Sequence, residues 1–278
     1  MYCSPRRLLG SLERADYGGD RIELFIMVDH SNDNADVINA SHAFEFSHGR
    51  KTVDVATVRK GLRQMWFDAW TPMDDSHFGC IIEDDIEMSP QWHVWLKAAW
   101  KAYGNRTDIN GISLSRQTVV PKNPRPRDRE VVNEHKPFLY AMVGSWGFSP
   151  HPKQWSSFLT WIKTIDLKTY DVSTPGLVTS NWWNTLDKTG IWTQYYIYFS
   201  KKHDIYTLYV NLPDKTTLAA HHREKGVHYP TSLGPDFKLA TSVNKDFPSQ
   251  LVKYGWNAKP MGDVSNLLPG ETMDNYKF

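Results

Sequence analysis

The chain has 278 residues, of which 40% are hydrophobic and 23% charged; these are values of a globular protein and exclude a disordered, collagen-like or coiled-coil chain. Lys and Arg total 32 while Asp and Glu total 31, so no overall field favours nucleic acid or a membrane surface as a partner. The two cysteines exclude a disulfide framework and a cysteine-rich zinc site.

The apolar residues occur in short runs. No run approaches the ~18 residues of a membrane span. The N-terminal residues also lack the apolar core of about 7–15 residues that marks a secretory signal. We therefore expect a soluble, cytoplasmic protein without a membrane span.

Two patterns of apolar residues alternate along the first 115 residues. Helical spacing predicts helices over residues 6–17, 37–44, 58–70 and 90–103. Short apolar runs predict strands over residues 22–28, 52–55, 78–82 and 109–114, and the first and third have the composition of buried strands. This alternation is typical of an open, mostly parallel α/β sheet, whose ligands bind beyond the carboxyl ends of the strands.

The rest of the chain is less regular. Residues 119–137 are basic and rich in Pro and predict a mobile loop, and residues 144–150 predict a rigid segment rich in turns. Helices are expected over residues 155–162 and 192–200, a strand over residues 205–210, and an irregular, polar stretch over the last ~40 residues.

Three adjacent carboxylates, Glu83–Asp85, follow the predicted strand 78–82. Their mutual repulsion is strongest where water is scarce, so a compensating cation is favoured. Mg²⁺ and Mn²⁺ prefer such oxygen ligands and often share them with a diphosphate. A solvated acidic turn before Pro90 is the alternative. The second acidic strand end, at Asp29, favours a binding site.

Asp29 follows the predicted strand 22–28 and is therefore expected at the same sheet edge as Asp84. A carboxylate there can accept a hydrogen bond from a base or a ribose hydroxyl of a nucleotide. It can equally close an Asx-turn with Ser31. The pattern leaves both interpretations open.

A second polar cluster extends from His221 to His228. His221 or His222 can complete a carboxylate-based metal shell, because imidazole is a common ligand of first-row metals. Arg223 can face a phosphate. The cluster does not have the spacing of a closed zinc site. An exposed polar turn is the alternative.

Twelve tryptophans are more than core packing usually requires, because a buried indole N–H needs a partner. Flat aromatic side chains can also pack on the C–H faces of sugars. Trp155 and Trp161 lie near helical spacing and are expected in the core. The residues that we expect to stack on a sugar are Trp146, Phe148, Trp182 and Trp183.

The motifs and their order resemble nucleotide-sugar glycosyltransferases of the GT-A type. The sequence has no dinucleotide-binding or P-loop glycine motif and no nucleophile elbow. The strand ending at Asp29 is followed by Arg59–Leu62 and then by the acidic triplet, as in that family. More narrowly, the sequence is similar to a set of glycosyltransferases from algae, marine eukaryotes and their viruses, distantly similar to those associated with modified DNA bases. This likeness extends over residues 2–237 and includes residues 11–17, 83–90, 144–150 and 223–228.

The resemblance implies one α/β domain of the GT-A type over residues 1–237, with a nucleotide-binding half at 1–115 and an acceptor-binding half at 116–237. An irregular C-terminal extension, residues 238–278, is expected to pack on it. The implied activity is metal-dependent transfer of a sugar from a nucleoside diphosphate, with a UDP-sugar as the expected donor. The expected acceptor is a hydroxyl of a glycan or glycoprotein.

Roles for individual residues follow from the same resemblance. Asp85 is expected to bind Mn²⁺ or Mg²⁺, and the other candidate ligands are Glu83, His221, His222 and His228. The candidates for donor binding are Asp29, Arg59, Lys60, Asp84 and Arg223, and those for acceptor binding are the four aromatic residues above. Glu224 is preferred to Asp187 as the general base, because a helix N-terminus near Asp187 would weaken it as a base.

Two other functions are compatible with these patterns. One is a carbohydrate-binding module that has lost its catalytic activity, although such a module has little use for an intact acidic triplet. The other is a glycosyltransferase acting on hydroxymethylated DNA bases. A local group of basic residues could then contact phosphates, namely Arg116, Lys122, Arg125, Arg127 and Arg129. A lid over the diphosphate is the preferred interpretation of that loop.

Overall fold

The computed structural model describes residues 4–117, 130–174, 177, 190–224, 231–256 and 260–261. Its α-helices are α1 (Ser4–Glu13), α2 (Ala35–Ala43), α3 (Gly61–Ala69), α4 (Trp92–Tyr103), α5 (Pro152–Ile162) and α7 (Thr193–Lys202). The longer strands are β1 (Ile22–Val28), β2 (Gly49–Val55), β3 (Ile86–Met88), β4 (Ile109–Ser113), β5 (Phe138–Tyr140), β6 (Phe148–Pro150), β7 (Tyr206–Tyr209) and β9 (Ala219–Arg223). The shorter elements are a 3-10 helix (Pro213–Lys215), β8 (Thr216–Thr217), β10 (Gly234–Pro235), β11 (Lys238–Leu239), β12 (Lys253–Tyr254) and β13 (Pro260–Met261). All the predicted helices are therefore confirmed, with shifted ends.

The largest sheet has six strands in the order β13-β12-β5-β7-β4-β6. Only the β12–β5 and β7–β4 pairs are parallel, while the other neighbours are antiparallel. The fold is thus mixed α/β. The largest sheet is mixed and not the mostly parallel sheet that the sequence predicted. The reason is that β5 and β6, each three residues long, were not predicted, and they pair antiparallel to β7 and β4, respectively.

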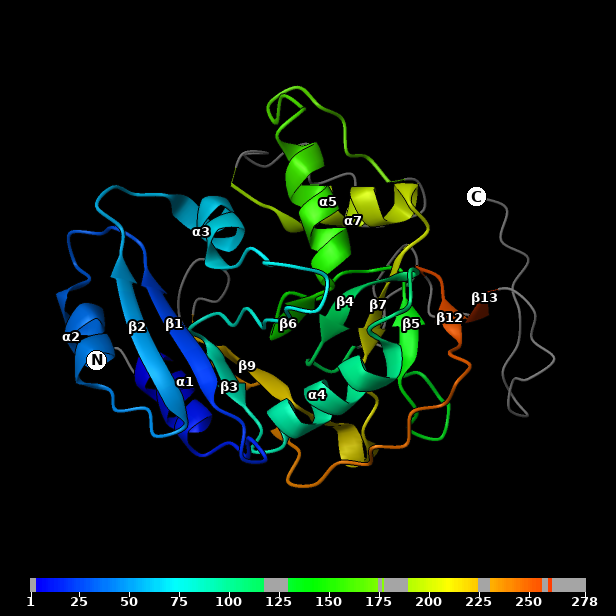
Figure 1. The fold of residues 1–278 in the computed structure, drawn as a ribbon, viewed down its shortest axis with the longest axis horizontal. Coiled ribbons are helices and arrows are strands. Elements are labelled where there is room, and N and C mark those ends of the chain that lie inside the picture. Colours follow the sequence, from blue (N-terminus) through cyan, green and yellow to red (C-terminus); the bar gives the residue numbers. More distant parts are fainter. Residues whose placement is uncertain are drawn as a thin grey trace.

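A separate parallel pair, β1 and β2, forms the left side of the molecule in Figure 1. Its register runs from Ile22 opposite Gly49 to Val28 opposite Val55. Ile22 and Leu24 pack against the core, whereas Phe25 is 58% exposed. The apolar run 22–28 is therefore a strand with one covered face and not the fully buried strand that its composition predicted.

Residues 78–82 are extended but do not form a regular strand. Ile81 makes an isolated antiparallel bridge to Phe148, with N–H···O distances of 2.8 and 3.0 Å. Cys80 and Ile82 pack on one core cluster, while Ile81 packs on another. The segment therefore runs between the two clusters and ends in the acidic triplet.

The two core clusters explain most of the tryptophans. The first surrounds the buried face of α4, including Trp95 and Ala99, and the second joins α5 to α7 through Trp155 and Tyr196. Trp155 is fully buried, as predicted, and Trp161 packs on the same cluster. Several buried indoles donate hydrogen bonds to the protein: Trp66 to Glu83, Trp100 to Ser149 and Trp155 to the carbonyl of Trp70.

The C-terminal segment also contributes to the largest sheet. Lys253 of β12 lies opposite Leu139 of β5, and the N–H of Leu139 donates to the carbonyl of Val252 at 2.9 Å. Within the described ranges, every helix is too short or too polar to cross a bilayer.

Candidate functional site

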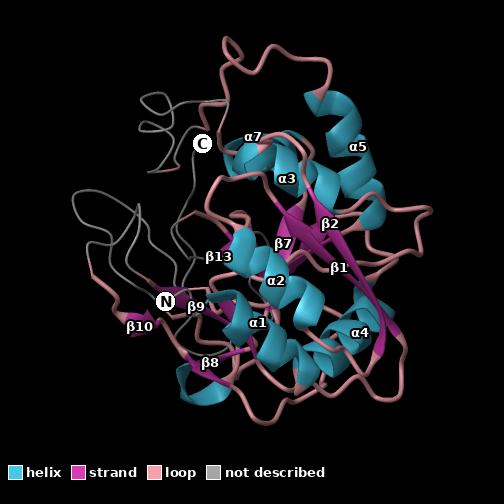
Figure 2. Cartoon of the chain, turned by 90° about the vertical axis from the view of Figure 1, so that its left-hand side faces the viewer, coloured by secondary structure: helices cyan, strands magenta, loops and turns pink. Residues whose placement is uncertain are grey.

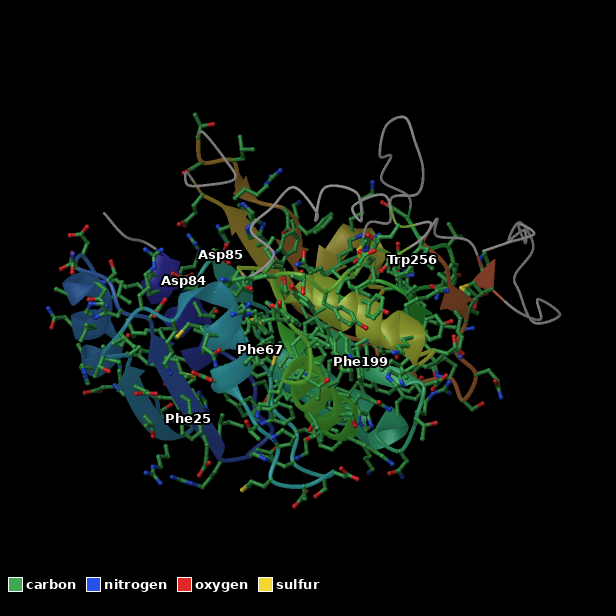
Figure 3. All side chains as sticks on the ribbon, turned by 90° about the horizontal axis from the view of Figure 1, so that it is seen from above. Phe25, Phe67, Asp84, Asp85, Phe199 and Trp256 are labelled. Carbon is green, nitrogen blue, oxygen red and sulfur yellow. The ribbon has the colours of Figure 1, made fainter. Side chains whose placement is uncertain are left out.

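The pairing of β3 with β9 brings the acidic triplet next to the histidine cluster. The two strands are antiparallel with Ile86 opposite His221, and the N–H of His222 donates to the carbonyl of Asp85 at 2.9 Å. Figure 3 labels Asp84 and Asp85 at this edge, next to β9. His221, His222 and Arg223 thus belong to a strand, and for these three residues the interpretation as an exposed turn is wrong.

Asp85 and His221 form the centre of the candidate site. Nε2 of His221 lies 3.2 Å from Oδ2 of Asp85, and the imidazole side chain is only 10% exposed. The other oxygen of Asp85, Oδ1, is buried and has no hydrogen-bond partner in the described part of the chain. Leaving a buried acceptor unsatisfied costs free energy, so this oxygen is suited to a cation or a donor ligand.

Trp146 covers the imidazole of His221. The two rings are stacked, with centroids 4.3 Å apart and an angle of 15° between their planes. The turn that holds Trp146 lies close to β9: a Cβ at Gly147 would come within 2.9 Å of Cβ of Ala219. Gly147 also has a positive φ of +66°. Glycine is needed at that position for both reasons.

Asp236 is a site residue that the sequence analysis missed. Its Oδ1 accepts from the N–H groups of His221, at 3.0 Å, and of Phe237, at 2.7 Å. Its Oδ2 is buried without a partner in the described structure, and burial raises the pKa of the carboxyl group. Asp236 follows Gly234–Pro235 in an irregular stretch, and only its pairing through β10 with β9 brings it to His221.

Glu83 points into the core and not towards solvent. Its Oε1 accepts a hydrogen bond from the indole N–H of Trp66 at 2.9 Å, and Trp66 stacks on Trp192 with ring centroids 4.2 Å apart. Burial and the neighbouring Asp85 carboxylate raise the pKa of Glu83 to about 7. The raised pKa favours the protonated form of Glu83, which lowers the repulsion within the triplet.

The predicted metal ligands are only partly brought together. Asp85 and His221 provide an oxygen and a nitrogen donor, a combination that suits Mn²⁺. His222 instead forms a hydrogen bond to Glu87 at 2.8 Å, and His228 lies outside the described residues. Among the residues that are described, no three His, Cys, Asp or Glu side chains form a metal-binding group.

The candidate base Glu224 lies at the end of β9, in contact with α1. Its Oε1 is 2.5 Å from the guanidinium of Arg7, and its side chain is 36% exposed. The neighbouring Arg223 donates to the carbonyls of Leu233, Gly234 and Pro235. Its guanidinium thus holds the β9–β10 pair together. The rival base, Asp187, lies outside the described residues.

Asp29 closes the N-terminus of α3. Its carboxylate accepts from the backbone N–H groups of His30, Lys60 and Gly61 at 2.8–2.9 Å. Burial raises its pKa, but these hydrogen bonds outweigh burial and lower the pKa overall. Asp29 and the exposed Arg59 line an open hollow of about 410 Å³. The ammonium group of Lys60 points elsewhere and binds Asp68 at 2.7 Å.

The candidates for acceptor binding differ in their accessibility. Trp146 is half-buried, with one face against His221. Phe148 is completely buried in the second core cluster, so we correct its assignment, because it has no surface to offer an acceptor. Trp182 and Trp183 lie outside the described residues.

The described part of the basic loop is not available to phosphates either. The buried guanidinium of Arg116 donates to the carbonyl of Leu212 at 3.1 Å and lies 3.6 Å from Glu130. Lys122, Arg125, Arg127 and Arg129 lie outside the described residues.

The protein is a mixed α/β domain in which the acidic triplet Glu83–Asp85 lies beside His221 of β9. Residues 4–170 match the protein family described as the SPBC1E8.03c C-terminal domain, and the chain belongs to that family. The matched region includes the acidic triplet and Trp146 but ends before β9. No curated protein matches the chain.

Proposed function

We propose that the protein is a metal-dependent glycosyltransferase that moves a sugar from a nucleoside diphosphate, preferably a UDP-sugar, to a hydroxyl acceptor. The main support is the pair of Asp85 and His221 at the end of an extended segment, with one buried oxygen of Asp85 left without a partner. A divalent cation on this pair would satisfy that oxygen and leave coordination positions for a diphosphate.

The architecture that we propose is of the GT-A type. Its support is the alternation of helices and strands over the first 115 residues, together with the position of the triplet after residues 78–82. The helix α3 also links two parts of the proposed donor site, since Asp29 binds its N-terminus and its Trp66 binds Glu83. The hollow beside Asp29 and Arg59 is the proposed place for the nucleoside.

Each residue has a distinct role in the proposed reaction. Asp85 and His221 would hold Mn²⁺ or Mg²⁺, and such an ion offsets the charge of a leaving diphosphate. Glu224 takes the proton of the acceptor hydroxyl, which requires that it lie within hydrogen-bond reach of that group. The exposed part of Trp146 packs on the acceptor sugar, so a glycan is preferred to a DNA base.

Calorimetric titration with UDP, with and without Mn²⁺, tests this function. We expect metal-dependent binding by the parent protein and its loss in Asp85→Asn, because the amide keeps the size but not the charge that holds the cation. Asp246→Asn is the matched control, since Asp246 is exposed and lies outside the site. The control should bind UDP like the parent.

A screen of UDP-, GDP- and TDP-sugars with Mn²⁺ then identifies the donor through its hydrolysis. If the parent binds no nucleoside diphosphate in the presence of metal, the transferase assignment is wrong. Binding of free sugars without metal would favour the carbohydrate-binding module instead.

A further inference from the structure

The helix α1 lies along β3 with one polar stripe facing it. Arg7 and Ser11 are spaced so that they share one face of the helix, and Arg14 follows directly after the last helical residue, Glu13. Ser11 Oγ accepts from the N–H of Met88 at 3.0 Å, and Arg14 lies 3.7 Å from Glu87. Figure 2 shows α1 beside α2 on this side of the molecule. Arg7 lies one turn before Ser11, towards the N-terminal end of the helix.

Arg7 there faces acidic side chains. Its NH2 group pairs with Oε1 of Glu224 at 2.5 Å, and its side chain is 20% exposed. The charge of Arg7 also acts on Asp84. The guanidinium therefore interacts with two carboxylates of the candidate site, Glu224 directly after β9 and Asp84 in the acidic triplet.

Of the three cations expected at the donor, Arg59 lines the hollow beside Asp29, and the other two are engaged elsewhere. Arg223 donates to three backbone carbonyls of the β9–β10 pair, at 3.0–3.4 Å. The ammonium group of Lys60 binds Asp68 within α3. Arg7, by contrast, pairs with a carboxylate that is itself 36% exposed. A more highly charged anion can compete with such a partly exposed carboxylate for the guanidinium.

We propose that Arg7 binds the diphosphate of the donor and exchanges Glu224 for it. This inference rests on the proposed function and adds a residue that neither motif nor resemblance indicated. A guanidinium binds phosphate oxygens through two parallel N–H groups. The exchange also releases Glu224 in its charged form, so that donor binding frees the group that accepts the acceptor proton.

Calorimetry with Mn²⁺ and three probes, UDP, pyrophosphate and uridine, tests the exchange. In Arg7→Gln, we expect UDP and pyrophosphate to bind about tenfold or more weakly, the scale of a lost charge-assisted hydrogen bond, while uridine binding is unchanged. Arg7→Lys should lose less, because it keeps the charge but not the paired N–H groups. Arg14→Gln, which changes the arginine directly after the same helix, should bind all three like the parent.

Glu224→Gln separates the exchange from a purely structural ion pair. If Glu224 competes with the diphosphate for Arg7, its removal tightens UDP binding several-fold, opposite to the effect of Arg7→Gln. Circular dichroism verifies that each variant is folded. If Arg7→Gln does not fold, Arg7→Lys takes its place in the test. Unchanged UDP binding in both Arg7 variants, or weaker binding in Glu224→Gln, would overturn the inference. A parent protein that binds neither UDP nor pyrophosphate would instead overturn the proposed function.

Discussion

The stacked rings of Trp146 and His221 combine two roles in one contact. The indole stacks on the imidazole beside Asp85 and packs against the first core cluster, and part of its surface is exposed. A side chain in this position can both orient the imidazole and present a flat face to a sugar.

Removing the indole should therefore separate the two roles. In Trp146→Ala, we expect transfer to acceptor to fall about fivefold or more, the scale of ~1 kcal/mol of lost stacking, with a smaller loss of donor hydrolysis. Trp146→Phe should recover part of the transfer. Equal losses of hydrolysis and transfer would show that Trp146 acts only by orienting His221.

The residue types in the sequence indicated several residues of the candidate site but not which of them lie next to each other. The triplet and His221 were recognised separately because carboxylates after an apolar run and adjacent histidines are unusual. Their proximity depends on the register of β3 with β9, which no local pattern encodes. Phe148 was expected to stack on a sugar with the other aromatic residues, yet its bridge to Ile81 places it in the core.

At the level of elements, the turn before β6 determines where Trp146 lies. Gly147 is in the left-handed region, and the carbonyl of Gly147 accepts from the N–H of Leu114 at 2.9 Å. The turn is therefore fixed against β4 as well as against Ala219 of β9.

Gly147→Ala should destabilise the protein by about 1–2 kcal/mol, because alanine is strained at positive φ and its Cβ would meet Ala219. Urea unfolding followed by tryptophan fluorescence measures the loss. Gly61→Ala is the comparison, since Gly61 also has positive φ but a Cβ there would meet nothing within 4 Å. Equal losses in the two variants would show that the contact with β9 has no effect.

The elements were predicted best where one pattern extends over several turns or residues. The amphipathic spacing of α4 and the run that forms β7 are examples. Strands of two or three residues, such as β5, β6 and β12, exist only through their partners and leave no periodic signal. Residues 78–82 show the reverse case: their composition is that of a strand, but only Ile81 has a ladder partner.

Across the whole molecule, one charged cluster ties the C-terminal segment to the central strands. Asp108, just before β4, accepts two hydrogen bonds from Arg106 at 2.9 Å and lies 3.2 Å from the ammonium group of Lys253 in β12. Burial raises the pKa of Asp108, but the hydrogen bonds and charges of Arg106 and Lys253 outweigh burial and lower it overall.

This cluster should make stability depend on pH. Because the folded pKa of Asp108 lies below its unfolded value of about 3.9, the stabilisation is complete above that value and is lost as pH falls through the folded pKa. We expect Asp108→Asn to be about 1–2 kcal/mol less stable than the parent at pH 7. The difference should shrink steadily below about pH 4. A difference that is independent of pH would show that charge plays no part.

Within the described residues, β1 pairs with β2 alone, and the last residue of β1 precedes the carboxylate that anchors α3. Local openings of this two-stranded unit require fewer broken contacts than openings of the six-stranded sheet. Each opening also releases the N-terminus of α3 and dissolves the hollow beside Asp29. A ligand that binds in this hollow binds only the closed form and therefore stabilises the β1–β2 unit against opening. The amide hydrogens of β1 and β2 should then exchange more slowly once the ligand is bound.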